Sequence, residues 1–405
     1  MTTSSSLTTP IPANTAQGIS AELALFIQAR IRQNAGWLGF DDFMSAALYT
    51  PGLGYYANGS AKFGHLPQGL RNAQGAIVGA GSDFVTAPEM SPLFGQALAR
   101  QLAQALDATG TDEVWEFGAG TGALALQLLD ALAAMGKSVR RYTIVDLSES
   151  LKDRQRQTLA AHSGTVYWAS ELPTEMRGVV LGNEVLDAMP VQLLARVGGI
   201  WHERGVVCQV AGDGGGESAD DGAGDRGGFA WADRPTRLRL PLEIEGDHDY
   251  LTEIHAQGEA FVRSLADKLT VGAIFLLDYG FPESEYYHSQ RHMGTVMCHR
   301  AHQSDDNPLL DVGLKDITAH VNFTGIAVVA QESGLELLGY TNQAHFLMNC
   351  GLAEAMESAT LQERVAAHKL IAEHEMGEFF KVMGLCKGEP WPAVGFSRGD
   401  KTHRL

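Results

Sequence analysis

The stretch DEVWEFGAGTGA, residues 112–123, decides the fold of this chain. An apolar run reaches Glu116, and glycines then stand at every second position, as Gly118, Gly120 and Gly122. A strand that ends in glycines at the start of a helix exposes backbone N–H groups and the positive end of the helix dipole. Glycine permits the sharp turn and the close approach of a ligand, because a Cβ would occupy the ligand's space. The stretch therefore predicts a strand, a ligand-binding turn and a helix.

Outward from this turn, short apolar runs alternate with helical stretches. The runs EVWEF, YTIVDL, GVVLGNEVL and AIFLLDYG are separated by stretches such as GALALQLLDALAAMG, which is typical of βαβ units and a parallel sheet. Between the fourth and fifth expected strands, VQLLARVGGIWHERGVVCQV predicts two strands about a Gly-Gly turn. We therefore expect an α/β fold, a Rossmann-like and mostly parallel twisted sheet with an inserted β-hairpin region and helical lid segments.

The composition along the chain predicts six segments. ISAELALFIQARIRQ and PLFGQALARQLAQALDATG have helical spacing, and the second helix should stop at Gly110. Residues 64–82 and 281–312 are expected to form loops, and the acidic, glycine-rich stretch 211–228 a solvated loop. The expected segments are a disordered tail (1–19), an N-terminal helical and lid region (20–95), the first part of the core (96–200), an inserted hairpin with the acidic loop (201–245), the second part of the core with a long active-site loop (246–345) and a helical C-terminal region (346–405).

Composition and charge exclude some partners. Of the 405 residues, 45% are hydrophobic and 19% are charged, which is typical of a soluble globular protein. Lys plus Arg number 30 against 48 Asp plus Glu, and the resulting net charge of −18 would repel a phosphate backbone. We therefore expect no nucleic-acid partner, whereas a cationic protein or peptide substrate would be attracted.

Cysteine usage and the first residues bear on where the protein works. Cys208, Cys298, Cys350 and Cys386 lie far apart with no CxxC pair, so neither a disulfide framework nor a structural zinc site is indicated. Residues 1–18 contain no Lys or Arg and no apolar core, unlike a signal peptide. No run approaches the roughly 18 apolar residues of a membrane helix. We expect a cytoplasmic location and no membrane span, and the oligomeric state stays open.

The position of Glu116 favours one ligand over its main competitor. GAGTGA also satisfies the dinucleotide pattern, so NAD remains a competing ligand. A pyrophosphate gains nothing from a carboxylate so close to its binding loop, whereas S-adenosylmethionine carries a sulfonium cation, an amino group and a ribose. A second acidic residue should hold the ribose hydroxyls, and Asp146 follows the next apolar run. The alternative for Asp146 is to cap the next helix together with Ser148.

Further motifs follow one another along residues 40–350. They are FMSAALYTPGLGYY (43–56), SDFVTAPEMSPLFGQ (82–96), WEFGAGTGALA (115–125), LGNEVLDAMPV (181–191), LLDYG (276–280), GTVMCHRAH (294–302) and DVGLKDITAHVNF (311–323). In this order they resemble the MidA-like S-adenosylmethionine-dependent methyltransferases, whose mitochondrial members are complex I assembly factors that methylate a protein arginine. The resemblance implies a class I methyltransferase fold, S-adenosylmethionine as the cofactor, a protein substrate and, by analogy, a respiratory complex subunit as that substrate. The segment 62–84 is longer and more polar than the resemblance leads one to expect.

Methyl transfer is an in-line displacement at carbon, so the site must align donor and acceptor and exclude water. Asn183 and Glu184 follow the fourth strand, where methyltransferases of this fold face the methyl group and the acceptor. Glu184 is expected to hold the acceptor nitrogen, and a guanidinium would bind it through bidentate hydrogen bonds. Asp187 shares this role or caps the next helix.

Other expected site residues come from the later motifs. Asp278 ends the fifth strand and would orient the substrate or the lid, and His320 would accept a proton or order a loop. For Thr86 and Glu89, capping of the next helix is the alternative to a place in the lid. The expected catalytic residues are Glu184, Asp187, Asp278 and His320; the expected cofactor-binding residues are Glu116, Gly118, Gly120, Gly122, Asp146, Leu147 and Asn183; the expected lid residues are Asp83, Thr86 and Glu89.

Two alternative functions stand beside the methyltransferase hypothesis. An NAD-dependent oxidoreductase would bind NAD in calorimetry where a methyltransferase binds S-adenosylmethionine. An assembly chaperone that keeps the cofactor fold as a scaffold is disfavoured by the intact acidic residues of the site. We expect no metal. The possible ligands are His288, His292, Cys298, His299 and His302, and their spacing matches no standard set of zinc ligands.

Overall fold

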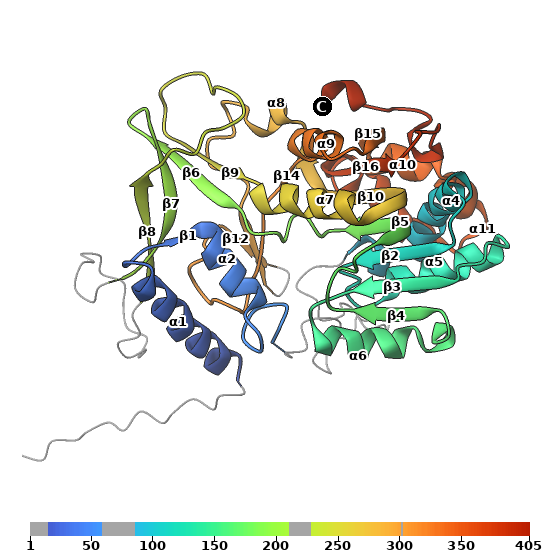
Figure 1. Cartoon of the computed structure of the whole chain (residues 1–405), viewed down its shortest axis with the longest axis horizontal. Helices are drawn as coiled ribbons and strands as arrows, with labels where there is room; N and C mark the ends of the chain where they lie inside the picture. Colours follow the sequence, from blue (N-terminus) through green and yellow to red (C-terminus); the bar gives the residue numbers. More distant parts are fainter. Residues whose placement is uncertain (1–14, 59–85, 210–227, 301–302) are drawn as a thin grey trace, which may run out of the picture.

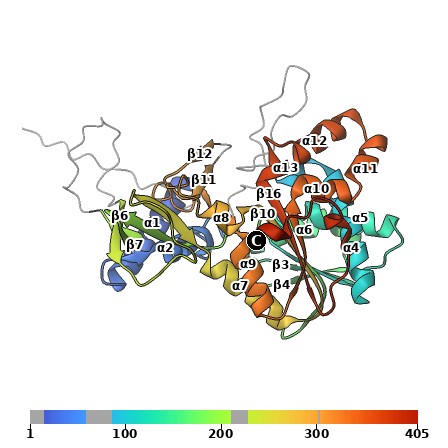
Figure 2. The ribbon, with the colours of Figure 1, turned by 90° about the horizontal axis from the view of Figure 1, so that it is seen from above.

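The molecule has two parts, one built on a large mixed sheet and a smaller one built on antiparallel strands (Figures 1 and 2). The computed structural model describes residues 15–58, 86–209, 228–300 and 303–405. Most of the expected tail, the loop at 64–82 and nearly all of the acidic loop therefore lie outside the described residues. The last residues of the expected tail are helical, since α1 (Ala16–Gln33) begins at Ala16 and the Thr15 hydroxyl accepts the N–H of Gly18.

The large sheet has the strand order β15-β16-β10-β5-β2-β3-β4, with β14 beside the end of β10. The five strands from β4 to β10 are parallel, as the alternation of apolar runs and helices predicts. Strand β16 lies between β10 and β15 and is antiparallel to both. The bounds are β2 (Glu113–Phe117), β3 (Arg141–Val145), β4 (Val166–Ala169), β5 (Met176–Asn183), β10 (Leu269–Phe281), β14 (Val321–Asn322), β15 (Glu336–Asn342) and β16 (Phe380–Lys387).

Helices cover both faces of this sheet, and the alternation of side chains along β10 shows how (Figure 1). Ala273, Phe275 and Leu277 pack in one cluster with α4 and α5, while Ile274 and Leu276 pack in another with α7 and α9. Successive side chains of a strand point to opposite faces, so one apolar run serves both layers. The helices of the two layers are α4 (Pro92–Thr109), α5 (Ala123–Ala134), α10 (Gln343–Asn349), α11 (Leu352–Ser358) and α12 (Leu361–Ile371), and α7 (Ala256–Lys268) and α9 (Phe323–Glu332).

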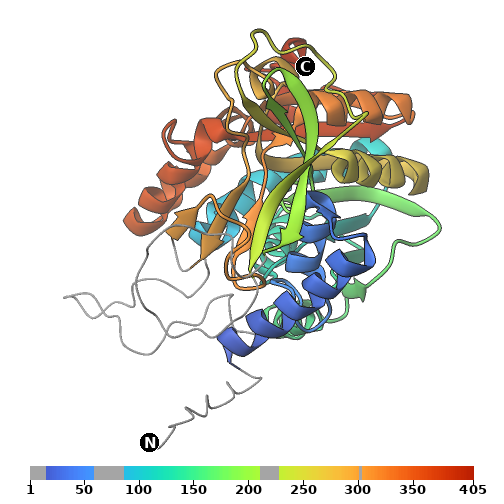
Figure 3. The same ribbon diagram turned by 90° about the vertical axis from the view of Figure 1, so that its left-hand side faces the viewer.

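The expected hairpin is present, and it belongs to a second sheet. Its strands pair about Gly198 and Gly199, whose positive φ of 55° and 80° suits a tight hairpin turn. They form part of a five-stranded sheet against which α1 and α2 (Phe40–Tyr49) pack, as Figure 3 shows with these helices in blue. The strands are β1 (Leu38–Gly39), β6 (Gln192–Val197), β7 (Ile200–Cys208), β8 (Phe229–Pro235) and β9 (Tyr250–Ile254).

Two expectations about the later chain are wrong. The expected long loop at 281–312 contains α8 (Glu283–Tyr286), and its β11 (Met297–Arg300) pairs with β12 (Gln303–Asp305) and β13 (Asp316–Thr318). The expected helical region 346–405 contains β16 as well as α13 (Met376–Phe379). Long-range pairing decides both cases, since a short polar strand or a strand buried on both faces has no local pattern that separates it from a loop or a helix.

The chain passes between the two parts at the carboxyl ends of the parallel strands. The chain leaves the large sheet after β5 to form β6 and returns through α7 to β10. Ligands bind at this edge of open α/β sheets because several loops converge there. Within the described ranges, neither α1 nor any other helix has the length and apolar character needed to cross a membrane.

Candidate active site

A cavity of about 1210 Å³ lies at the carboxyl ends of β2, β3 and β5. Its floor comes from the turns that follow these strands, and its far wall comes from the end of α2 and from α7. Of the expected site residues it is lined by Thr86, Glu89, Glu116, Gly118, Gly120, Asp146, Leu147, Asn183 and Glu184. The fold thus brings together residues from several segments that lie far apart in the sequence.

The glycine turn between β2 and α5 has the form that the sequence predicts. Gly118, Gly120 and Gly122 have φ of 63°, 53° and 82°, which side-chain-bearing residues rarely adopt. A Cβ on Gly120 would have no atom within 4 Å and would project into open space. The turn and the N-terminus of α5 thus present bare backbone to the cavity, which suits the polar end of a ligand.

Glu116 is the acidic residue just before the turn. Its side chain is buried, lines the cavity and accepts a hydrogen bond from the Tyr142 hydroxyl at 2.7 Å. Burial raises the pKa of Glu116 to about 7, since the neutral hydroxyl only partly compensates the lost hydration. A cationic ligand beside it would favour the ionised form.

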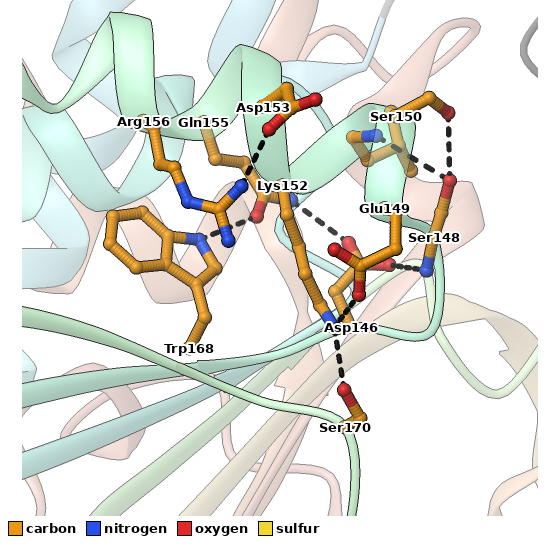
Figure 4. Close-up of polar contacts among 11 residues, drawn as sticks. Asp146, Ser148, Glu149, Ser150, Lys152, Asp153, Gln155, Arg156, Trp168 and Ser170 are labelled. Atoms are coloured by element: carbon orange, nitrogen blue, oxygen red, sulfur yellow. Dashed lines mark hydrogen bonds and ion pairs between the residues drawn. The ribbon is translucent and has the colours of Figure 1, made fainter.

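Asp146 follows β3 and is held on both carboxylate oxygens. Oδ1 accepts the N–H of Ser148 at 2.9 Å, and Oδ2 accepts the Gln155 amide at 2.8 Å (Figure 4). The N-cap of α6 (Glu149–Thr158) is Ser148, whose hydroxyl accepts the N–H of Leu151. Asp146 itself does not cap the helix and lines the cavity. The neighbouring Leu147 lines the cavity and is 73% exposed, which places an apolar surface beside a carboxylate.

Glu184 stands directly after β5 in an unusual state. Its φ of 54° lies in the left-handed region, which is strained for a residue with a side chain and is often found at functional sites. Oε1 accepts the Asn183 amide at 3.0 Å, whereas Oε2 and the Asn183 Oδ1 are buried with no hydrogen-bond partner among the described residues. Burial, with a contribution from Asp187, raises the pKa of Glu184 to about 8. The pair therefore has two unpartnered oxygens to offer a ligand, and a cationic ligand would favour the ionised form of Glu184, in which both oxygens accept.

Asp278 supports the turn that carries Glu184, and neither Asp278 nor Asp187 lines the cavity. Asp187 Oδ1 is buried without a hydrogen-bond partner among the described residues. Asp278 Oδ2 accepts the N–H groups of residues 185, 186 and 187 at 3.1, 2.8 and 3.2 Å. No helix follows Asp187, because the next element is β6, so the capping alternative is wrong. Burial raises the pKa of both carboxyl groups. Asp278 acts on the site through the backbone of this turn, and catalysis by either residue stays a prediction.

His320 does not line the cavity either. Its carbonyl oxygen is 2.5 Å from His255 Nε2, and its ring stacks beside Tyr279 at 6.1 Å between centroids. Burial lowers the pKa of His320 to about 4, which keeps the ring neutral. These contacts fit the ordering of a loop, while proton transfer by His320 stays a prediction.

The expected lid is described in part. Thr86 and Glu89 line the cavity at α3 (Ala87–Met90), and Asp83 lies outside the described residues. The Thr86 side chain makes no capping hydrogen bond, and the cap of α4 is Ser91, whose hydroxyl accepts the N–H of Leu93 at 3.3 Å.

Three tyrosines complete the wall on the side of the smaller part, and a buried aspartate that does not line the cavity holds one of them. Tyr49, Tyr55 and Tyr56 line the cavity, and the Tyr56 hydroxyl donates to the carboxylate of Asp316, with both oxygens at 2.9 Å. We did not predict roles for these residues, although they lie within the motifs 43–56 and 311–323. The pairing of aromatic and acidic residues in two distant motifs is the signal that could have found them.

The charge of the cavity wall has one sign. Among the lining residues that the structure describes there is no Lys, Arg or His. The charged ones are all acidic: Glu89, Glu116, Asp146, Glu149, Glu171 and Glu184. Such a wall favours a cationic ligand. No group of three or more potential metal ligands occurs in the described ranges.

The sheet order with its antiparallel β16, the glycine turn and the two acidic strand ends define a class I S-adenosylmethionine-dependent methyltransferase. A family model described as "Putative S-adenosyl-L-methionine-dependent methyltransferase" matches residues 97–341, and the chain belongs to this family. The resemblance to MidA-like methyltransferases is thus confirmed.

A solved structure and curated proteins are similar to this chain over most of its length. A crystal structure of a protein from Burkholderia thailandensis bound to S-adenosyl-homocysteine is 44% identical, covers 98% of this chain and 100% of that one, and superposes with a TM-score of 0.86. The mitochondrial protein arginine methyltransferase NDUFAF7 homolog of Caenorhabditis elegans is 25% identical over 94% of this chain and 91% of its own length. NDUFAF7 of Danio rerio is 25% identical over 87% and 85%. The cofactor is therefore S-adenosylmethionine.

The residues present fit this cofactor. Glu116 and the bared glycine turn suit its amino-acid end and sulfonium, and the fixed carboxylate of Asp146 suits ribose hydroxyls beside the apolar surface of Leu147. The unpaired Asn183 Oδ1 offers one more acceptor. These individual assignments stay predictions.

Proposed function

We propose that this chain methylates the side-chain nitrogen of an arginine in a protein. The observation that carries the proposal is the carboxyl group of Glu184, which lies in a strained backbone and has one oxygen without a partner among the described residues. A guanidinium is planar and always charged, and its N–H groups fit a carboxylate in pairs. The acidic wall disfavours an anionic acceptor.

The chemistry needs little from the protein beyond alignment and charge. S-adenosylmethionine supplies a methyl group on a sulfonium and leaves as the neutral thioether S-adenosyl-homocysteine. Glu184 would hold the guanidinium so that one nitrogen faces the methyl carbon. As the C–N bond forms and the bond from the methyl carbon to sulfur breaks, that nitrogen would pass one proton to the Glu184 carboxylate. The Asp278 carboxylate keeps the Glu184 turn in place through three backbone N–H groups.

The relatives support the arginine acceptor, because those at 25% identity are named protein arginine methyltransferases. We extend the proposal to the partner and the location. The acceptor would be a subunit of a respiratory complex, and the protein would meet it in the cytoplasm, as its reduced cysteines suggest.

The test is methylation by the purified protein. The extract of a host that lacks the gene is incubated with S-adenosylmethionine and either the wild-type protein or Glu184→Gln, and mass spectrometry then locates residues that gain one or two CH₂ increments. We expect new methylarginine with the wild type and at least about a hundredfold less with Glu184→Gln, since the charged anchor of the acceptor is lost. Glu175→Gln is the matched control, since Glu175 is exposed at the opposite end of β5.

Other outcomes would redirect the proposal. Methyl groups on lysine or on a small molecule would overturn the arginine assignment. Full rescue of a gene-deletion phenotype by a Glu184→Gln protein that still binds S-adenosyl-homocysteine, but transfers no methyl group, would favour the assembly chaperone.

A further inference from the structure

Gln155 is a buried polar residue of α6 that does not line the cavity. Its amide nevertheless contacts two of the segments that do. Nε2 donates to the carbonyl oxygen of Gly120 at 3.0 Å and to Asp146 Oδ2 at 2.8 Å. The glycine turn after β2 and the acidic strand end after β3 are therefore joined through one side chain.

The orientation of this amide is determined by its partners. Oε1 accepts the indole N–H of Trp168 at 3.0 Å, and an indole N–H can only donate (Figure 4). The Gly120 carbonyl can only accept, so the nitrogen must face it, and Asp146 Oδ2 lies within reach of the same nitrogen. All three hydrogen bonds are satisfied in one orientation, and turning the amide over would break them together.

Nothing else in the described structure ties Gly120 and Asp146 to one another through a side chain. Gly120 has a φ of 53°, and the space beside its Cα is open because no heavy atom lies within 4 Å of where a Cβ would be. The neighbouring Thr121 carbonyl is also held from α6, by the Thr158 hydroxyl at 2.9 Å. Asp146 Oδ1 is held only from its own turn, by the N–H of Ser148. The backbone joins the two segments at their start, where the Gly118 N–H donates to the Val145 carbonyl at 3.3 Å, and Gln155 adds a side-chain link further on, at Gly120 and Asp146.

We propose that Gln155 is a positioning residue for the methyl donor, which orients the Gly120 carbonyl and the Asp146 carboxylate toward S-adenosylmethionine without contacting it. Trp168 supports this role by holding the Gln155 oxygen. The proposal concerns the donor site and does not depend on which acceptor is methylated.

The test uses Gln155→Glu, which keeps the size of the side chain and the acceptor for Trp168 but replaces the two N–H donors with an anion beside Asp146. Calorimetry with S-adenosyl-homocysteine should show an affinity at least about tenfold weaker, because two buried acceptors lose their donor. The matched control is Gln157→Glu, the same change at an exposed position of the same helix, which should leave the affinity unchanged.

Loss of binding in Gln155→Glu could also follow from local unfolding, and pH separates the two causes. The introduced carboxyl group, once protonated, has one O–H that can replace one of the lost donors, so the affinity relative to wild type should recover as the pH is lowered. A KM for S-adenosylmethionine that rises more than kcat falls is expected as well. Unchanged affinity in Gln155→Glu, or a loss that does not recover at low pH, would overturn the proposal.

Discussion

Glu184 combines a strained backbone with a buried, partly unpaired carboxyl group. Its neighbours Asp187 and Asp278 are also buried acids, so this corner of the molecule brings together carboxyl groups that cannot all be ionised at low cost. Ionising these buried acids lowers the free energy of unfolding when no cation is bound, whereas a bound cation would stabilise their ionised forms. The properties of single residues here should be visible in how stability and binding change with pH.

The free energy of unfolding should fall as the pH rises from about 4.5 to about 8, because native Glu184 keeps a proton that the unfolded chain releases. Glu184→Gln removes the part of this dependence that belongs to Glu184, while Glu116, Asp187 and Asp278 keep theirs, and should be more stable than wild type above pH 8 by on the order of 1–3 kcal/mol. Denaturant unfolding across this pH range measures the effect. Glu175→Gln should keep the wild-type slope, and a Glu184→Gln protein that is less stable than wild type at alkaline pH would contradict the prediction.

Glu116 should couple cofactor binding to proton release. Its raised pKa of about 7 means that part of the carboxyl group is protonated near neutral pH, and a bound cation favours ionisation. The affinity for S-adenosylmethionine should therefore rise with pH up to about 7 and then level off. Calorimetry in buffers of different ionisation enthalpy measures the released proton, and Glu116→Gln should bind more weakly and release less. Equal proton release in both proteins would rule out this role for Glu116.

At the scale of elements, the glycines around α5 can be required for two reasons, a positive φ that favours glycine and the space that a ligand needs, and two of them allow these reasons to be tested apart. Gly120 and Gly136 stand before and after α5, both have positive φ, and a Cβ on either would meet no atom within 4 Å. They differ in that only Gly120 lines the cavity.

Alanine at either position should therefore cost similar stability, about 1 kcal/mol from backbone strain. Only Gly120→Ala should lose affinity for S-adenosyl-homocysteine, by about tenfold or more, since the added methyl group takes up ligand space. Thermal unfolding and calorimetry on the two variants make the comparison. If both variants bind like wild type, the cofactor does not approach the backbone at Gly120.

The elements differ in how well local sequence predicts them. The glycine turn, α4 with its cap at Gly110 and the hairpin about Gly198 follow from short-range rules and are confirmed. Strand β16 does not, because it inserts late in the chain between β10 and β15 and is buried on both faces. The contact of Tyr56 with Asp316 joins positions 260 residues apart, which no local pattern reports.

At the scale of the whole molecule, the net charge of −18 and the acidic cavity wall act in the same direction. Association with a cationic acceptor should be steered by this field and screened by salt. The KM for an arginine-containing basic peptide should rise several-fold between about 0.05 and about 0.3 M salt, where the Debye length shortens. The Kd for S-adenosyl-homocysteine, which has no net charge, should change little. A KM that is independent of salt would show that the acceptor is not held by charge.

The sequence by itself determined the ligand-binding turn, the alternation of strands and helices and the class of cofactor, because these depend on residues within one or two turns of chain. Only the tertiary structure decided which acidic residues face the cavity. Glu116, Asp146 and Glu184 do so, while Asp278 turns to the backbone of residues 185–187. The reason is physical: the direction of a side chain at a strand end depends on register and on the partners that long-range packing supplies.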